Sequence, residues 1–182
     1  MRMPYDQSFA ILTERVEIIG DPQPGVTRPP RHDDEAPGPS IFRQMLVNVS
    51  LTDLTLPGLY IGRSELKHVS FSGSDLQLAT FNWSDLVDCD FSGADLSGAD
   101  LRSCRFVRCL FRSTNLAGTD LRGSSFEWCA FVDAVLAAAK LHRRPRVLGF
   151  LKLGADQANL PLSSAQRREI DWSAEVPVPG GG

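Results

Sequence analysis

Phe91-Ser-Gly-Ala-Asp-Leu-Ser-Gly-Ala-Asp100 is the stretch that decides the fold, because it is one five-residue unit written twice. Each unit begins with a bulky apolar residue, Phe91 or Leu96, and continues with small residues and an aspartate. Outward from this stretch, a bulky apolar residue returns at every fifth position without an insertion or deletion. The series is Ile41, Leu46, Leu51, Leu56, Ile61, Leu66, Phe71, Leu76, Phe81, Leu86, Phe91, Leu96, Leu101, Phe106, Phe111, Leu116, Leu121, Phe126, Phe131, Leu136 and Leu141.

The five-residue period fits neither of the common secondary structures. A helix with 3.6 residues per turn would spread the series around its surface, and a strand would send alternate members to opposite faces. The period therefore belongs to a coiled backbone, and the sequence predicts a repeat protein. Two residues before each bulky position, from Ser64 to Ala139, the side chains are small or of modest size. We expect one large and one small side chain to point inward from each unit.

These units resemble the pentapeptide-repeat family, whose unit reads roughly Ala-Asp/Asn-Leu/Phe followed by two variable positions. The resemblance covers about 100 of the 182 residues. It implies an all-β fold, a right-handed, quadrilateral parallel β-helix with four units to a coil and hence about five coils. Such closure requires same-face residues to recur every twenty positions. Two columns do so: Leu56, Leu76, Leu96, Leu116 and Leu136, and Phe71, Phe91, Phe111 and Phe131.

The repeats divide the chain into three parts, which we expect to form one domain. These are an N-terminal cap segment and Pro-rich linker at 1–40, the β-helix at 41–141, and a C-terminal cap or dimerisation segment at 142–182 with a short helix and a disordered tail. The stretch 8–19 fits a strand or a short helix, and either would cover the first coil. Ser163 and Gln166 have the spacing of a capping box, which predicts a helix to about Trp172.

An apolar run follows the repeats and is too hydrophobic to be left in water. We expect it either to cover the last coil or to form a homodimer contact. The candidate dimerisation residues are Val147, Leu148, Phe150, Leu151 and Leu153.

Nothing in the sequence indicates export or a membrane. Charged residues interrupt every apolar run near the N-terminus before a signal peptide could form. No stretch approaches the roughly 20 apolar residues of a membrane span. We therefore expect a cytoplasmic protein.

The four cysteines all fall at the inward small position, and Cys89, Cys109 and Cys129 are spaced by twenty residues. Parallel side chains on successive rungs are badly aimed for a disulfide. They also stand in a line, whereas a zinc site needs converging ligands. We expect buried thiols that act as small apolar groups, with no metal and no cofactor.

The twenty-residue register sorts outward residues into columns. One column reads Asn48, His68, Asp88, Arg108 and Trp128, and its neighbour reads Val47, Lys67, Val87, Val107 and Glu127. Arginine and aromatic anchors beside aliphatic area are typical of interfaces. Asp88, Arg108 and Trp128, with Val87 and Val107 as exposed aliphatic surface, are therefore candidate partner-binding residues. The alternative is that the first three only stabilise neighbouring rungs through a salt bridge and a cation–π contact.

A second face shows opposite charges side by side. Its columns contain Arg43, Arg63 and Trp83, then Asp100 and Asp120, then Arg102 and Arg122. We expect these charges to neutralise one another.

Catalysis finds little support in the residues. The three histidines stand in the linker, on one face and after the last repeat, and none is near a recognisable nucleophile. A rod filled by its own side chains also leaves no cleft for a substrate. We expect no enzymatic activity.

The family resemblance implies one specific function. Several bacterial members protect type II DNA topoisomerases from quinolones or peptide toxins, and the usual explanation is that an acidic rod imitates DNA. Residues 41–141 hold eleven acids and nine bases, whereas a mimic on the order of 24 Å long would want about fourteen negative charges. Five acids stand within 85–100, and we expect them to offer a local contact: Asp85, Asp88, Asp90, Asp95 and Asp100.

The specific candidate is therefore protection of DNA gyrase or topoisomerase IV, as a partial DNA mimic or an antibiotic self-resistance factor. The alternative is a scaffold or adaptor that binds another protein and has no role at topoisomerases. Neither function involves direct nucleic-acid binding.

Overall fold

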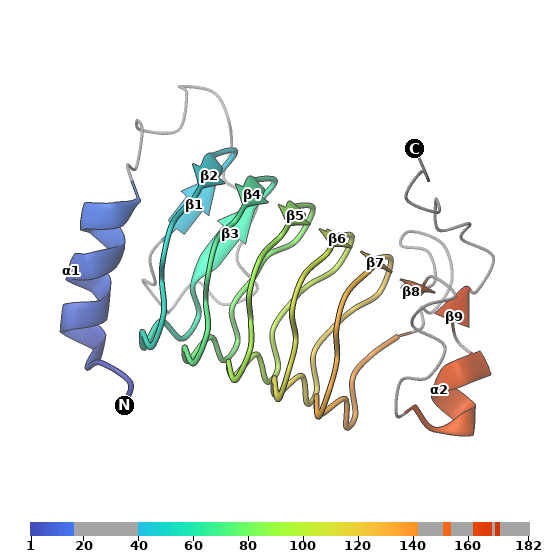
Figure 1. Ribbon diagram of the computed structural model, residues 1–182. Helices are drawn as coiled ribbons and strands as arrows, with labels where there is room; N and C mark the ends of the chain where they lie inside the picture. The colour runs from blue at the N-terminus through green and yellow to red at the C-terminus, as the bar shows by residue number, and fades with distance from the viewer. Residues whose placement is uncertain (17–39, 142–150, 154–161, 169, 172–182) are drawn as a thin grey trace, which may run out of the picture.

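The computed structural model describes residues 1–16, 40–141, 151–153, 162–168 and 170–171. Figure 1 shows a solenoid that lies between helix α1 (Tyr5–Arg15) and a C-terminal group that contains helix α2 (Ser164–Arg168). The strands are β1 (Ser40–Phe42), β2 (Met45–Val47), β3 (Tyr60–Gly62), β4 (Glu65–Lys67), β5 (Asp85–Val87), β6 (Arg105–Val107), β7 (Ser125–Glu127), β8 (Leu151–Leu153) and β9 (Ile170–Asp171).

The coils stack with a step of twenty residues, which confirms the predicted parallel β-helix. On one side, seven parallel strands pair in the order β2-β4-β5-β6-β7-β8-β9. Leu66 of β4 is opposite Leu46 of β2 and Leu86 of β5. Isolated parallel bridges such as Asp75↔Asp95 and Asp90↔Leu110 repeat the same step on the other sides.

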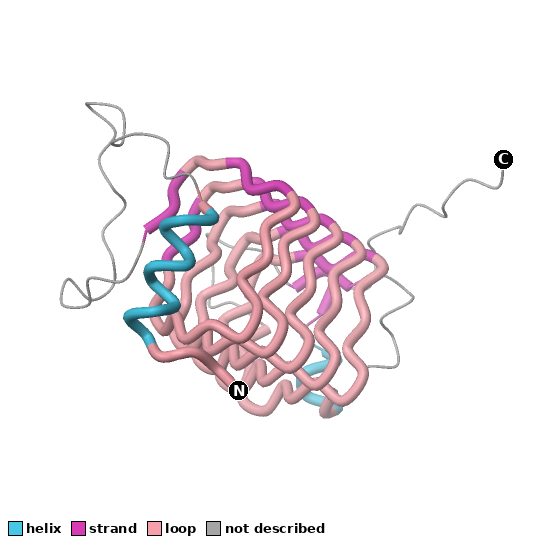
Figure 2. The backbone as a smooth tube through the Cα atoms, turned by 60° about the vertical axis from the view of Figure 1, so that its left-hand side comes forward, coloured by secondary structure: helices cyan, strands magenta, loops and turns pink. Residues whose placement is uncertain are grey.

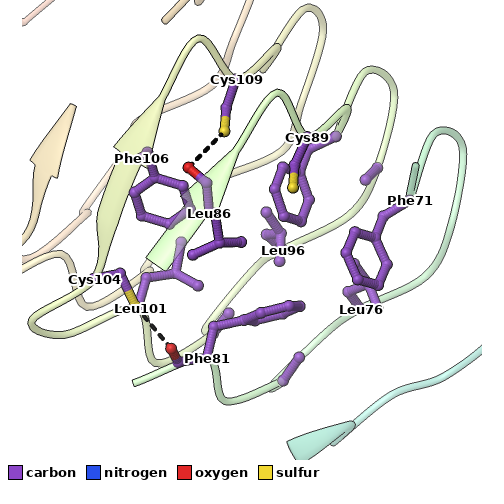
Figure 3. Close-up of a cluster of buried hydrophobic side chains, with 14 of the residues drawn as sticks. Phe71, Leu76, Phe81, Leu86, Cys89, Leu96, Leu101, Cys104, Phe106 and Cys109 are labelled. Atoms are coloured by element: carbon purple, nitrogen blue, oxygen red, sulfur yellow. Dashed lines mark hydrogen bonds between the residues drawn. The ribbon is translucent and has the colours of Figure 1, made fainter. Parts of the chain in front are cut away.

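The interior is a stack of side-chain ladders, and it is full. Phe91 lies parallel to Phe71 and Phe111, with ring centroids 5.1 and 5.2 Å apart. It also meets Phe81 edge-on, at 5.8 Å, and Figure 3 shows how such rings and leucines close the space inside the coils. Every bulky residue from Ile41 to Leu141 is at most 7% exposed. Because each such side chain contributes about 1.5–3 kcal/mol on burial, these ladders hold the coils together.

Every corner of the coil has a left-handed backbone. The corner residue stands two positions after each bulky residue, and from Arg43 to Ala138 every corner has φ between 50° and 75°. At many corners the amide of the next residue closes a turn, as Ala99 N–H does to Leu96 O at 3.0 Å. A turn of this kind with positive φ at its third residue is type II. Fourteen corners nonetheless carry a side chain, so the five-residue period enforces a conformation that those residues do not prefer.

The corners also decide which small residue points inward. Alanine occurs at this position only where the turn hydrogen bond forms, as at Ala79 and Ala99. At a corner without this turn bond, a side chain of the next coil accepts the hydrogen bond instead. Ser124 Oγ, for example, accepts from Cys104 N–H at 3.0 Å. The inward hydroxyls and thiols also donate to the coil before, as Cys109 Sγ does to Leu86 O at 3.4 Å (Figure 3). Buried polar groups at these positions are therefore satisfied.

The corner geometry predicts a difference between two substitutions at Gly118, where φ is 68°. Gly118→Val is expected to lower the free energy of unfolding by about 1–2 kcal/mol, because a β-branched residue resists this conformation. An added Cβ would meet nothing closer than Gly98 N at 3.9 Å, so the effect isolates the backbone. Gly118→Asn is the control and is expected to cost less, because asparagine tolerates positive φ. Equal costs in urea unfolding would contradict this account.

Helix α1 covers the first coil (Figure 2). Of the two conformations that the sequence leaves open for 8–19, the structure has a helix, which ends at Arg15. Its buried face carries Ser8 and Leu12. Ser8 Oγ accepts a hydrogen bond from Thr55 N–H at 2.8 Å, and Met3 N–H donates to Asp53 O at 2.8 Å. The N-terminal segment thus supplies bonds that a preceding coil would otherwise make.

At the other end, β8 adds to the last full coil. Residues Lys152 and Leu153 of β8 are opposite Ser125 and Phe126 of β7, and β9 follows β8. Leu151 and Leu153 therefore belong to a strand paired within the chain, while Val147, Leu148 and Phe150 lie outside the described residues. The homodimer contact stays a prediction.

Helix α2 is shorter than predicted. It ends at Arg168 instead of reaching Trp172, because Ile170–Asp171 forms β9. The predicted disordered tail lies outside the described residues. No helix in the described part of the chain is long and apolar enough to cross a membrane.

Candidate protein-interaction surface

The seven-stranded sheet gives the solenoid one regular outer face, seen along one side in Figure 2. We call the outward residues of β2, β4, β5, β6 and β7 the strand face. The residues on either side of each buried leucine or phenylalanine point outward, because side chains alternate along a strand. One edge of this face is the corner column from Asn48 to Trp128, and the opposite edge is the corner column from Arg43 to Trp83.

Asp88 and Arg108 form a two-pronged ion pair between neighbouring coils. Arg108 Nε donates to Asp88 Oδ1 at 2.7 Å, and Nη2 donates to Oδ2 at 2.6 Å. The Arg108 hydrogen bond holds the pKa of the Asp88 carboxyl below its usual value. The arginine side chain is 55% exposed, so solvent weakens the contribution of this pair to stability. The alternative that these residues only stabilise neighbouring rungs requires a salt bridge, and that salt bridge is present.

Trp128 stands apart from that ion pair. Within the described residues, no cation–π contact joins Arg108 to Trp128. The contact of this kind between neighbouring coils is instead Arg63 over the Trp83 ring, at 5.8 Å. Trp128 is 37% exposed and keeps part of its indole in solvent, as an interface anchor would.

The expectation that Val107 contributes exposed aliphatic surface is wrong. Val107 is 7% exposed and Val87 is half-buried. The same two strands carry a second ion pair, in which Arg105 Nε and Nη2 donate to Glu127 at 3.1 and 3.0 Å. Long arginine stems cover neighbouring apolar residues while their charged ends stay in water. The exposed aliphatic residues of the strand face are Met45 and Val47.

The acids within 85–100 do not form one patch. Twenty residues make one circuit of the coil, so acids that are close in sequence are spread over its sides. Asp85 lies on the strand face and Asp88 at its corner. Asp90 and Asp95 lie on the next two sides, where they accept from Ser92 N–H and Ser97 N–H, and Asp100 lies on the fourth. A local contact between these acids and a partner stays a prediction, and the partner would have to reach around the coil to touch all five.

Charges on the fourth side neutralise each other only in part. Asp100 accepts from Arg102 Nε at 2.7 Å, and Asp120 pairs with Arg122. These hydrogen bonds raise the pKa of both guanidinium groups. Arg43 and Arg63, in contrast, have no ion pair among the described residues. The sequence did not distinguish the two groups.

The thiols offer no reactive site. All four cysteines are buried and free. Burial raises the pKa of Cys104, and the neighbouring Cys109 thiol together with burial raises that of Cys89. A protonated thiol is neither a good nucleophile nor a metal ligand. In the described ranges, no three His, Cys, Asp or Glu side chains converge as a metal site would require.

Comparison with known proteins identifies the repeat. A family model described as Pentapeptide repeats matches in eight copies, over residues 60–93 and 89–127. The repeats of this chain are pentapeptide repeats. The matched copies span the middle coils of the solenoid. No protein of curated function matches the sequence.

Solved pentapeptide-repeat structures also resemble the chain. One from the Arabidopsis thaliana thylakoid lumen is 27% identical, over 57% of this chain and 69% of its own, with a TM-score of 0.34. One from the cyanobacterium Cyanothece 51142 is 15% identical, over 57% and 84%, with a TM-score of 0.36. Full-length QnrB1, a plasmid-mediated fluoroquinolone resistance protein, is 14% identical, over 73% and 91%, with a TM-score of 0.27.

Proposed function

We propose that this pentapeptide-repeat protein is a non-catalytic, cytoplasmic scaffold that binds another protein through its strand face. The observation that carries the proposal is the filled interior, in which the phenylalanine ladder leaves ring centroids about 5 Å apart. Such a rod has no room for a substrate between its ladders, so its chemistry lies on its outer faces.

The strand face is the outer face best suited to a protein partner. Its charges are largely matched in pairs, Asp88 with Arg108 and Glu127 with Arg105. A surface that has already neutralised its own charges can be covered without leaving an isolated charge buried. Trp128, Met45 and Val47 add exposed apolar area of the residue types found in interface centres.

Site-specific photocrosslinking in the source organism tests this proposal. A photoreactive phenylalanine analogue at Val47 or Trp128 is expected to give a discrete crosslinked product with one partner protein. The same analogue at Gln77, which is also exposed but on another side, is the matched control and is expected to give none. The same product from Gln77, or no product from the strand face, would contradict the proposal.

Protection of DNA gyrase or topoisomerase IV is the second candidate, favoured by one column of acids. Asp75 and Asp95 lie on successive coils of one side, and both have no ion pair among the described residues. This column presents like charges along the rod, as duplex DNA does. A supercoiling assay with gyrase and a fluoroquinolone tests the idea. If the protein changes neither supercoiling nor drug-induced cleavage, this candidate is excluded and the scaffold proposal stands.

A homodimer through 147–153 remains a separate proposal, motivated by the apolar run. Light scattering at high protein concentration is expected to give twice the mass of one chain. A single-chain mass would show that the run only caps its own solenoid.

A further inference from the structure

Two arginines at one corner of the solenoid are exposed and lack carboxylate partners. Arg43 and Arg63 stand on successive coils, at corners with φ of 53° and 50°. The arginines of the later coils at 102, 105, 108 and 122 are each ion-paired. Within the described residues, Arg43 and Arg63 have no ion pair. Two adjacent like charges repel each other, so an incoming anion would relieve an existing repulsion.

Aromatic side chains hold both guanidinium groups in place. Arg43 Cζ lies 5.4 Å from the centroid of the Phe42 ring, and Arg63 Cζ lies 5.8 Å from that of Trp83. An arginine on an aromatic face loses less freedom when it then binds an anion, because the ring has already restricted it. Trp83 itself is 55% exposed, and an exposed tryptophan beside arginine is typical of binding hot spots.

The neighbouring coil is shaped to support this arrangement. The Tyr60 ring lies 6.4 Å from that of Phe42, and it covers Gly62 so closely that an added Cβ would stand 2.4 Å from Tyr60 Oη. Glycine at 62 therefore leaves room for the Tyr60 ring beside Phe42, with the two rings tilted by 37°, next to the corner that carries Arg43. Met45, 63% exposed, lies two residues beyond Arg43 on the strand face.

We propose that Arg43, Arg63 and Trp83 form a basic–aromatic corner that binds an acidic segment of a partner protein. Successive rungs lie about 4.8 Å apart, so the two guanidinium groups can hold one carboxylate between them or two adjacent carboxylates. Guanidinium matches carboxylate with paired hydrogen bonds. An apolar residue of the same segment packs on Trp83 and Met45. This corner lies on the edge of the strand face opposite to Trp128 and shares only Met45 with the proposed strand-face contact, so variants at Arg43 and Arg63 test it separately.

The surroundings of the corner favour an acidic peptide over nucleic acid. Glu65 and Asp85 occupy the next outward column on the strand face, and the chain carries a net charge of −3. Nucleic-acid binding rests on many phosphate contacts over an extended basic surface. Two arginines bordered by this column of carboxylates suit a short acidic segment, which makes few contacts and does not need to cross the neighbouring acids.

Fluorescence anisotropy with a labelled peptide of repeated Glu-Glu-Leu units tests the proposal. The wild-type protein is expected to bind this peptide and not a Gln-Gln-Leu peptide of the same length. Arg43→Glu with Arg63→Glu is expected to weaken binding by at least about tenfold, because two attractions become repulsions. Trp83→Ala is expected to weaken it by a smaller factor.

Arg112→Glu is the matched control, since Arg112 is also exposed but lies on another side, and no cation–π contact involves it among the described residues. It is expected to change the affinity by less than about twofold. Arg43→Gln with Arg63→Gln serves as a milder second variant, and thermal unfolding verifies that each variant is folded. The proposal is overturned if the Gln-Gln-Leu peptide binds equally well, if Arg112→Glu has the same effect, or if a DNA duplex displaces the acidic peptide.

Discussion

Ala99→Arg is expected to unfold the solenoid. Ala99 is 0% exposed and points inward between the ladders of leucine and phenylalanine. A guanidinium group there would be buried without a partner, and its side chain would also overfill a closed coil. We expect a loss of more than about 4 kcal/mol, enough to abolish most of the stability of an ordinary domain. Cys109→Arg, also at 0% exposure, is expected to act in the same way.

Ser97→Arg is the matched control for Ala99→Arg. Ser97 belongs to the same coil, only two residues earlier, but it lies on the outer side and is half-buried. It is expected to change the free energy of unfolding by less than about 0.5 kcal/mol. Circular dichroism during urea unfolding measures both variants. A folded Ala99→Arg protein with an unchanged melting temperature would refute the inward register.

Alkaline solution is expected to destabilise the protein steeply. The pKa values of Cys89 and Cys109 are raised in the folded state by the thiol of the next coil, Cys109 or Cys129, and by burial, and the pKa of Cys104 is raised by burial. In the unfolded chain a thiol ionises near pH 8.5. The folded protein therefore holds more protons above that pH, so stability is fully present below it and falls as the pH rises. Above that pH, each thiol should lower the free energy of unfolding by about 1.4 kcal/mol per pH unit. The three together should lower it by about 4 kcal/mol per pH unit.

Cys104→Ser separates this effect from other alkaline titrations. Serine already occupies positions 64, 84 and 124 of the same inward column, where it is buried and hydrogen-bonded. The variant should keep its stability at neutral pH and lose about one third of the alkaline slope, because its hydroxyl does not ionise. Guanidinium unfolding curves at several pH values measure the slope. An unchanged slope would show that the Cys104 thiol does not contribute to it.

The ladders could be predicted from the sequence because they depend only on counting. A bulky residue at every fifth position and a matching column at every twentieth leave one closed arrangement of the chain. The same counting predicts that all four cysteines point inward, and each is buried. Period alone thus determined which side chains face the interior.

The outer faces were harder to predict, since a column shows which residues are neighbours and not how their side chains bond. Arg108 was placed between Asp88 and Trp128, but it turns to the carboxylate alone. Val107 is predicted to be exposed but is buried, on strands that also carry the Arg105–Glu127 ion pair. Long side chains choose among several partners within reach, and the sequence does not show the choice.

Two features of the outer faces have signals in the sequence. The acids within 85–100 encircle the rod, since twenty residues make one circuit. The column of Arg43 and Arg63 has no acid in its own register, and this absence marked the two arginines as unpaired. Sorting charges by side of the coil instead of by position would have found both.

NMR of the folded protein tests the central claim, that the chain is a closed four-sided coil with a filled interior. Nuclear Overhauser effects between aromatic ring protons report contacts of a few ångströms. The account predicts that Phe91 shows strong effects to both Phe71 and Phe111, whose ring centroids lie 5.1 and 5.2 Å from its own. If Phe91 shows no effect to either ring, the coil does not close after twenty residues and the account is wrong.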